Sequence, residues 1–422
     1  MTMHRWIRGA AAIAIALTMA APAWAQDRLY HVGFELGAFG RFGERIGPSG
    51  GLDGRLAGGG RFAVRDSEVT DLRTGGSRAL PPGTIVTAID PARPRVFLSV
   101  PEPGGSDTAT LALFDIVTGT LEPLVQHACR QRSFGDGPAL AAYAYDAQLL
   151  VVQRCASPSS VADLVAVDLR RPARPQRVLP IATASAFRLE LSADGSRLYV
   201  QTSTGFLAYV TEAFDVDTGA RVGSAAGGTT ELRWDDALDG VLLISGGAFA
   251  PSEVWLFGPS LEPRGSATFV SHQCPVRVQA SPHTGRIYVT RNGTASTGAE
   301  PVVVEAYAGQ PLQLVASGRP SPSVTLSCEG AVLRTAPGAP RRLTAAVAGS
   351  DVTLDWVNVG AASAFAIDVG VAPGRTDASV LIGPDSTVTF VGVPRGTYYV
   401  RVRGGNEFGG GRPSSEIRLV VP

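Results

Sequence analysis

Two short stretches of the sequence place a histidine two residues before a cysteine. One reads VQHAC and ends at Cys129, and the other reads VSHQC and ends at Cys274. Imidazole and thiolate groups are good zinc ligands, so His127 and His272 with these cysteines make a candidate metal site. The usual CxxC-type spacing is missing from the sequence. We therefore expect no metal and favour disulfide-bonded cysteines in two equivalent loops.

No other motif in the sequence marks a catalytic centre. A GxSxG nucleophile elbow is absent, and GPSGG at Gly47–Gly51 reads as a glycine-rich loop. Asp235 and Asp236 are adjacent, and neighbouring strand residues point to opposite faces, so they do not form a glycosidase pair by themselves. His283, in ASPHTGR, fits an exposed turn. We therefore name no catalytic residue and expect no cofactor.

The amino terminus has the three parts of a secretory signal peptide. Positive residues precede an apolar run from Ala10 to Ala21, and Ala23–Ala25 is a small-x-small cleavage site. The apolar run is too short for a stable membrane anchor, and no later stretch is long and apolar enough for a second pass. We expect residues 1–25 to be removed and the remaining chain to be exported, to the periplasm or outside the cell.

The composition favours an all-β protein with many tight turns. The 422 residues include Gly 50 and Pro 30, and periodicity typical of helices is hard to find after the signal segment. The formal net charge is +0, and every basic side chain apart from histidine is arginine. No basic surface is therefore expected to bind nucleic acid.

One sequence pattern recurs through most of the chain. LSADGSRLYV, Leu191–Val200, joins two apolar strands by a tight turn, and its copies follow one another at steps of 43 to 53 residues. The copies are Ala88–Val100, Ala144–Gln153, Leu232–Ser245, Gln279–Thr290 and a degenerate Leu326–Thr335. A second marker, FDIVTG at Phe114–Gly119 and FDVDTG at Phe214–Gly219, predicts another tight hairpin. Each unit is thus expected to be one four-stranded antiparallel sheet.

Repeated four-stranded sheets bury their faces by stacking radially around an axis. RLYV at Arg197 and RIYV at Arg286 are nearest to the repeat signature, and residues 26–336 resemble the YVTN/WD40-like β-propellers of bacterial secreted proteins. The length and a weak copy at Leu52–Val64 favour seven blades over six. With seven, Arg28–Leu36 would cross over to complete the last blade and close the ring.

Residues 337–422 differ in character and resemble a fibronectin type III domain, an immunoglobulin-like β-sandwich. The resemblance is carried by Trp356 in an alternating strand and by GTYYVRVRGGNEFG, Gly396–Gly409. It implies that Tyr398 occupies the tyrosine corner, where its hydroxyl binds nearby backbone. Gly404 and Gly405, before Asn406, stand where the family usually has a larger apolar residue, so we expect loose packing there.

Four cysteines in an exported chain suggest two disulfides. In the strand pattern, Cys129 enters an inner strand and Cys155 follows the partner of that strand, which places both at the same face of the ring. We therefore pair Cys129 with Cys155. Cys274 and Cys328 remain as the second pair, although the same pattern puts them at opposite strand ends.

Two functions are compatible with this organisation. The first is a non-catalytic binding or scaffolding protein that contacts a protein or polysaccharide through long loops such as Ala128–Pro138 and Ala299–Pro301, and the missing catalytic motifs favour it. The second is an extracellular lactonase, polysaccharide lyase or glycoside hydrolase with its site at the mouth of the propeller channel. Acidic, basic and histidine side chains converging at one mouth, with shifted pKa values, would distinguish the enzyme.

Overall fold

The chain is an all-β protein with a β-propeller fold. The computed structural model describes residues 27–31, 34–39, 45–47, 55–65, 67–102, 108–130, 139–155, 163–181, 186–205, 208–226, 231–247, 250–269, 276–291, 303–308, 313–318 and 332–422. The one helical segment in these ranges is η1, a single 3-10 turn at Gly58–Gly60. Among the same residues, no helix combines the length and the apolar character that crossing a membrane requires.

Antiparallel sheets follow one another along the chain, each built from four consecutive strands. The first is β4 (Arg55–Ala57), β5 (Phe62–Val64), β6 (Glu68–Asp71) and β7 (Ser77–Ala79). Two groups of four come next: β8 (Ile85–Ile89), β9 (Arg95–Pro101), β10 (Thr108–Asp115) and β11 (Leu121–Cys129), then β12 (Ala141–Ala144), β13 (Leu149–Arg154), β14 (Asp163–Asp168) and β15 (Gln176–Val178). A single pairing of Ala128 with Arg154 joins these two groups into one continuous sheet.

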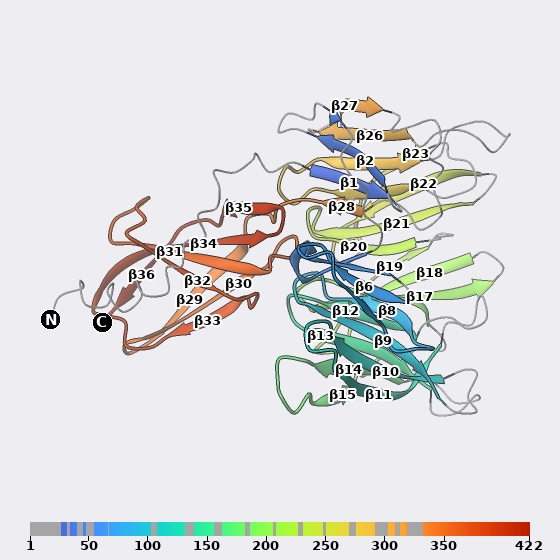
Figure 1. Cartoon of the computed structure of the whole chain (residues 1–422), viewed down its shortest axis with the longest axis horizontal. Coiled ribbons are helices and arrows are strands. Elements are labelled where there is room, and N and C mark those ends of the chain that lie inside the picture. The colour runs from blue at the N-terminus through green and yellow to red at the C-terminus, as the bar shows by residue number, and fades with distance from the viewer. Residues whose placement is uncertain are drawn as a thin grey trace.

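Three more sheets continue the pattern. Their strands are β16 (Ala186–Leu191), β17 (Arg197–Gly205), β18 (Ala208–Asp215) and β19 (Arg221–Ala226); β20 (Glu231–Asp235), β21 (Gly240–Gly247), β22 (Ala250–Phe257) and β23 (Pro263–Phe269); and β24 (Arg277–Ala280), β25 (Ile287–Arg291), β26 (Val303–Ala308) and β27 (Gln313–Gly318). Figure 1 shows the strands β16 to β27 as layers of the propeller, with colours that run from green through yellow to orange.

The amino-terminal strands complete the sheet that the last propeller strand begins. The strand order of this sheet is β28 (Val332–Arg334), β1 (Asp27–His31), β2 (Phe34–Phe39) and β3 (Arg45–Gly47). β1 runs antiparallel to β28, with Leu29 opposite Leu333. The crossover expected for Arg28–Leu36 is therefore confirmed, and it joins the two ends of the propeller segment through backbone hydrogen bonds.

The repeated markers fold as tight turns for a local reason. In the β18–β19 turn the Asp215 carboxylate accepts the Thr218 backbone N–H at 2.9 Å and the Thr218 hydroxyl at 2.9 Å. Gly219 has φ 70°, a left-handed conformation that side chains disfavour. The β10–β11 turn repeats this arrangement with Asp115, Thr118 and Gly119. These side chains fix the hairpins without help from distant residues.

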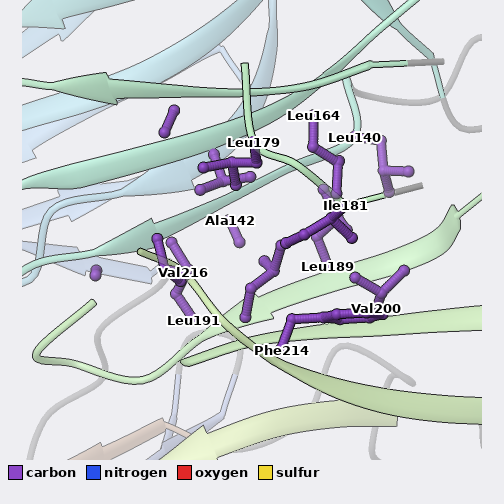
Figure 2. Packing of buried hydrophobic residues seen from close by; sticks show 14 residues of the cluster. Leu140, Ala142, Leu164, Leu179, Ile181, Leu189, Leu191, Val200, Phe214 and Val216 are labelled. Carbon is purple, nitrogen blue, oxygen red and sulfur yellow. The ribbon is translucent and has the colours of Figure 1, made fainter. Parts of the chain in front are cut away.

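Neighbouring sheets are held together by apolar side chains between their faces. Leu164 of β14 and Leu198 of β17 are fully buried in one such cluster, and Figure 2 shows it with Phe214 and Val200. Each leucine removed from water in this way contributes roughly 2 kcal/mol to folding. The face-to-face contact of sheets therefore supplies the core that a single four-stranded sheet lacks.

The carboxy-terminal residues form a two-sheet sandwich. One sheet contains β29 (Arg341–Ala348), β30 (Asp351–Val357) and β33 (Thr387–Phe390), and the other contains β32 (Ala378–Ile382), β31 (Ala364–Gly370), β34 (Gly396–Asn406), β35 (Gly409–Pro413) and β36 (Ile417–Val421). Trp356 and Phe365 meet edge to face between the sheets, with ring centroids 5.1 Å apart. The Tyr398 hydroxyl donates to the Pro394 carbonyl at 2.9 Å, which is the backbone contact expected of this tyrosine.

The expectation of loose packing at Gly404 is wrong. Gly404 is buried, and a Cβ placed on it would come within 2.8 Å of the Ala362 Cβ and 3.3 Å of the Pro337 Cβ. Two residues distant in sequence thus fill the space that a larger side chain would otherwise take.

A disulfide joins Cys129 to Cys155, with 5.2 Å between their Cα atoms. It lies beside the pairing of Ala128 with Arg154, at the point where the two groups of strands become one sheet. The sulfur of Cys129 is consequently bonded, so the alternative metal site built on His127 and Cys129 is wrong. His272, Cys274 and Cys328 lie outside the described residues, and their pairing stays a prediction.

Closure by β1 can be tested with Tyr30→Pro. Proline has no N–H and cannot occupy a central strand such as β1, so we expect the variant to lose roughly 3 kcal/mol of unfolding free energy. Tyr30→Val, which keeps the N–H and favours strands, is the control and should stay close to the parent protein. The measurement is urea unfolding followed by tryptophan fluorescence. Equal stability of the proline variant and the parent would show that this pairing does not close the ring.

Candidate functional site

The sandwich lies beside the propeller (Figure 1), and turns between first and second strands, such as those with Tyr145 and Asp236, meet it. A cavity of about 400 Å³ lies at this junction. Propeller residues Tyr145, Trp234 and Asp236 line one side of the cavity, and Ala361 and Phe408 of the sandwich line another. The site is thus built from segments that are far apart in the sequence.

Tyr145, in the turn after β12, is the central contact of this junction. Its ring is buried, and its hydroxyl donates to Asp236 Oδ2 at 2.5 Å. The same oxygen accepts the Ala361 backbone N–H at 3.3 Å and lies 3.2 Å from the Asn358 carbonyl oxygen. One phenol group therefore connects two turns of the propeller to the β30–β31 connection of the sandwich.

Asp146 makes the neighbouring contact across the junction. Its Oδ2 accepts the Asn358 backbone N–H at 3.1 Å, and the Ser386 side chain of the sandwich also contacts its carboxyl group. The Asn358 side chain is held by the Ala362 backbone at both of its polar atoms. Burial raises the pKa of Asp146 to about 7, because little water remains to solvate the charged form.

Two further carboxyl groups near the junction have raised pKa values. Burial raises the pKa of Asp236 to about 6, and the hydrogen bonds from Tyr145 and Trp234 only partly oppose this. Burial also raises the pKa of Glu190, on β16, to about 7, although part of its side chain is reached by solvent. Glu190 Oε1 accepts the Trp234 backbone N–H at 3.1 Å.

Asp90 differs from these three acids, because its carboxylate is paired with a cation. Asp90 is completely buried, and it accepts Arg95 Nε at 2.7 Å and the Tyr143 hydroxyl at 2.6 Å. Nearby, Arg93 donates to the Tyr145 carbonyl at 2.8 Å and to Asp385 of the sandwich at 2.9 Å. In this part of the junction, arginine side chains pair with aspartate carboxylates.

Ion pairs at the edge of the junction add contacts that are more exposed. Arg73 approaches Glu407 at 2.6 Å, and Arg342 approaches Asp194 at 3.3 Å. Exposed pairs of this kind each contribute little to stability, so the buried hydrogen bonds dominate the junction.

The site has limited means for catalysis. Carboxyl groups with pKa values near 6 to 7 are suited to proton transfer at neutral pH. Here Asp146, Glu190 and Asp236 each accept a hydrogen bond from the protein itself. Across the described part of the chain, no group of three or more histidine, cysteine, aspartate or glutamate side chains is placed to hold a metal ion.

The structure places the sequence-predicted residues as follows. Asp235 ends β20 and Asp236 begins the turn after it, so strand alternation does not separate them as expected, and both line the cavity. Asp235 accepts the backbone N–H groups of Ala237 and Ala280, whereas Asp236 accepts the Tyr145 hydroxyl. His127, on β11, is exposed and its Nδ1 lies 2.9 Å from Glu102, away from this junction. His283 is half-buried in a cleft beside the junction, so its expected exposed position is wrong.

Sequence reasoning missed Tyr145, Asp146 and Glu190, but the repeat does contain a signal for the first two. A short polar side chain caps this turn in several other copies: Asp90 accepts the Ala92 N–H at 3.0 Å, Asp235 accepts the Ala237 N–H at 3.1 Å, and Ser281 accepts the Thr284 N–H at 3.1 Å. Tyr145 breaks this pattern with a large side chain. A residue that cannot cap its own turn is free to serve a contact elsewhere.

The pH dependence of stability tests the assignment of Asp146. Its pKa is about 7 in the folded chain and lower when unfolded, so the native state holds the extra proton and stability falls as pH rises from about 4 to about 7. Asp146→Asn removes this loss. We expect the free energy of unfolding to rise by an amount on the order of 2 kcal/mol at pH 8, and by less towards pH 5. Urea unfolding at both pH values measures it.

Asp217→Asn, at a carboxylate whose side chain is 88% exposed, is the matched control and should change stability little at either pH. A loss of stability in Asp146→Asn at pH 8 would contradict the assignment, since it would mean that the charged form is favoured in the folded chain.

Comparison with known proteins finds structural similarity but no family for this chain. The sequence matches no protein-family model and no curated protein. The chain is similar to Porphyromonas gingivalis dipeptidyl peptidase 4, at 9% identity over 81% of this chain and 60% of that one, with a TM-score of 0.42. It is also similar to the β-propeller domain of the Pyrococcus furiosus Trilobed protease, at 9% identity over 75% and 87% of the two chains, with a TM-score of 0.37. The FN5 domain of Drosophila Lar matches 20% of this chain over 97% of its own length, at 19% identity and a TM-score of 0.18.

Proposed function

We propose that this chain is an exported, non-catalytic binding protein that contacts a protein or a polysaccharide. In this proposal residues 1–25 are a signal peptide, residues 26–336 form a seven-bladed propeller, and residues 337–422 are a fibronectin type III domain. The seven groups of four strands among the described residues, with β8–β15 taken as two groups, support the blade number. The Tyr398–Pro394 contact and the core around Trp356 support the assignment of the sandwich.

The proposal rests on one observation: the end of the propeller that carries Tyr145, Asp146 and Asp236 forms a structural joint with the sandwich. Asp236 and Asp146, the acids best suited to proton transfer there, are engaged by Tyr145 and by the Asn358 backbone. A general acid or base must come within hydrogen-bond reach of a substrate. Groups that are already bonded inside a joint between two parts of the chain favour binding over catalysis.

The same joint supports a role in presentation. Buried hydrogen bonds from Tyr145, Asp146 and Arg93 to the sandwich hold the two parts in one relative orientation. A ligand that contacts both parts would then meet a preformed surface, which lowers the entropy cost of binding. The long loops favoured from the sequence, 128–138 and 299–301, fall largely outside the described residues.

A hydrolytic or lyase activity is the second candidate, and one observation favours it. Asp236, with a pKa of about 6, lines the cavity of about 400 Å³. Glu190 and Asp146, each with a pKa of about 7, adjoin two other lining residues: Glu190 accepts the Trp234 N–H, and Asp146 follows Tyr145 in the chain. Shifted pKa values gathered beside a cavity are typical of enzyme sites, although buried structural networks produce them as well. Asp236 would be the acid in such a site.

The two functions are separated by incubating the mature chain, residues 26–422, with plant and bacterial polysaccharides and with lactones. We expect retention on at least one immobilised ligand and no product by mass spectrometry, because the acids at the mouth are engaged by the protein. The Asp236→Asn variant should then retain the same ligand. Product formed by the parent and lost in Asp236→Asn would overturn the binding proposal in favour of an enzyme.

A further inference from the structure

A cleft of about 710 Å³ runs along the outside of the junction. Its walls are the propeller turn 281–285, the segment that leads into β29, and the end of β35. Pro282 fixes this geometry, because a Cβ on Gly360 would lie 2.4 Å from its Cγ and a Cβ on Gly338 would lie 2.7 Å from its carbonyl oxygen. Two glycines thus let the turn approach closely, and the cleft is preformed.

The ionisable side chains that line the cleft are cationic or neutral. Among the described residues they are Arg341, Arg342, Arg412 and His283, and no described carboxylate lines the cleft. Two carboxylates stand at its edges, where Asp239 lies 3.6 Å from Arg341 and Asp194 lies 3.3 Å from Arg342. Three guanidinium groups and two carboxylates leave a net positive charge before His283 is considered.

Two of the four groups have unused hydrogen-bonding capacity. Arg412 is exposed and has no hydrogen bond or ion pair among the described residues. The Nδ1 atom of His283 is buried without a partner. Arg342 is also held in a left-handed conformation, with φ 52°, that non-glycine residues rarely adopt. Residues held in such strained conformations cluster at ligand-binding and active sites.

From this arrangement we propose that the cleft binds the carboxylate or sulfate groups of an acidic oligosaccharide. The inference rests on the binding function proposed above and names its ligand class. Guanidinium groups pair with planar oxyanions through two parallel N–H···O bonds. The volume of about 710 Å³ falls within the range of small-ligand sites and suits a short oligosaccharide.

An acidic glycan fits this cleft better than an acidic peptide does. Pro282, Pro340 and Pro413 line the walls, and proline has no N–H to offer to a peptide main chain. An extended peptide gains much of its affinity from main-chain hydrogen bonds to such donors. A sugar acid needs donors only for its carboxylate or sulfate and its hydroxyls, and side chains supply them here.

Isothermal titration calorimetry of residues 26–422 with trigalacturonate, with a sulfated trisaccharide and with neutral maltotriose tests the proposal. The two anionic arms distinguish carboxylate from sulfate as the group that is bound. We expect one anionic sugar to bind and maltotriose to bind far more weakly. Arg412→Ser should lower the affinity for the anionic sugar about tenfold. Raising the salt concentration should weaken it further.

Arg418→Ser is the matched control. Arg418 is also an exposed arginine of the sandwich, lies on β36 and does not line the cleft, so the two variants carry the same net charge. We expect Arg418→Ser to bind within twofold of the parent. Circular dichroism of both variants checks that the exposed substitutions leave the fold intact.

Each contrary outcome has a separate meaning. Equal affinity of Arg412→Ser and the parent would overturn the cleft as the site and leave the binding function standing. Equal binding of maltotriose, or tighter binding of a glutamate-rich hexapeptide that competes with the sugar, would overturn the ligand class. No binding of either anionic sugar would overturn the inference, whereas product formation in the substrate panel would overturn the proposed function itself.

Discussion

The hydrogen bonds of the Tyr145 hydroxyl are the interaction on which the arrangement of this chain depends. The phenol meets Asp236 of the propeller and the Ala361 N–H of the sandwich within one buried site. Burying a phenol and a carboxyl group is costly unless each has a partner, and here each satisfies the other. The two parts of the chain therefore have one favoured relative position, since separating them would leave these groups unpaired.

Acidity at the mouth follows from the same burial. The carboxyl groups of Asp146 and Asp236 have raised pKa values because the sandwich and the propeller turns exclude water from them. Raised pKa values, which taken alone would suggest a catalytic site, thus arise here from the contact between two parts of the chain. The joint also creates the cleft beside it, because Pro282 is held against Gly338 and Gly360 where the two parts meet.

Much of the fold could be predicted from the sequence because its turns are encoded locally. Asp215, Thr218 and Gly219 build a tight turn within the five residues 215–219, and the strands on either side alternate between more buried and more exposed side chains. The junction could not be predicted in this way. Tyr145 and Asp236 come from turns of different repeat copies, and only the closed ring brings them within 2.5 Å. The burial of His283 and the tight packing at Gly404 could not be predicted for the same reason, since the residues that pack against them are distant in sequence.

Hydrogen exchange measured by mass spectrometry on the parent and on Tyr145→Phe tests the joint most directly. We expect the segment 356–363, which contains the Asn358 and Ala361 amides, to be protected in the parent and to exchange about tenfold faster in the variant. The segment 396–402, within the sandwich core, should exchange equally in both proteins. An unprotected segment 356–363 in the parent, or unchanged exchange in the variant, would contradict a joint built on Tyr145.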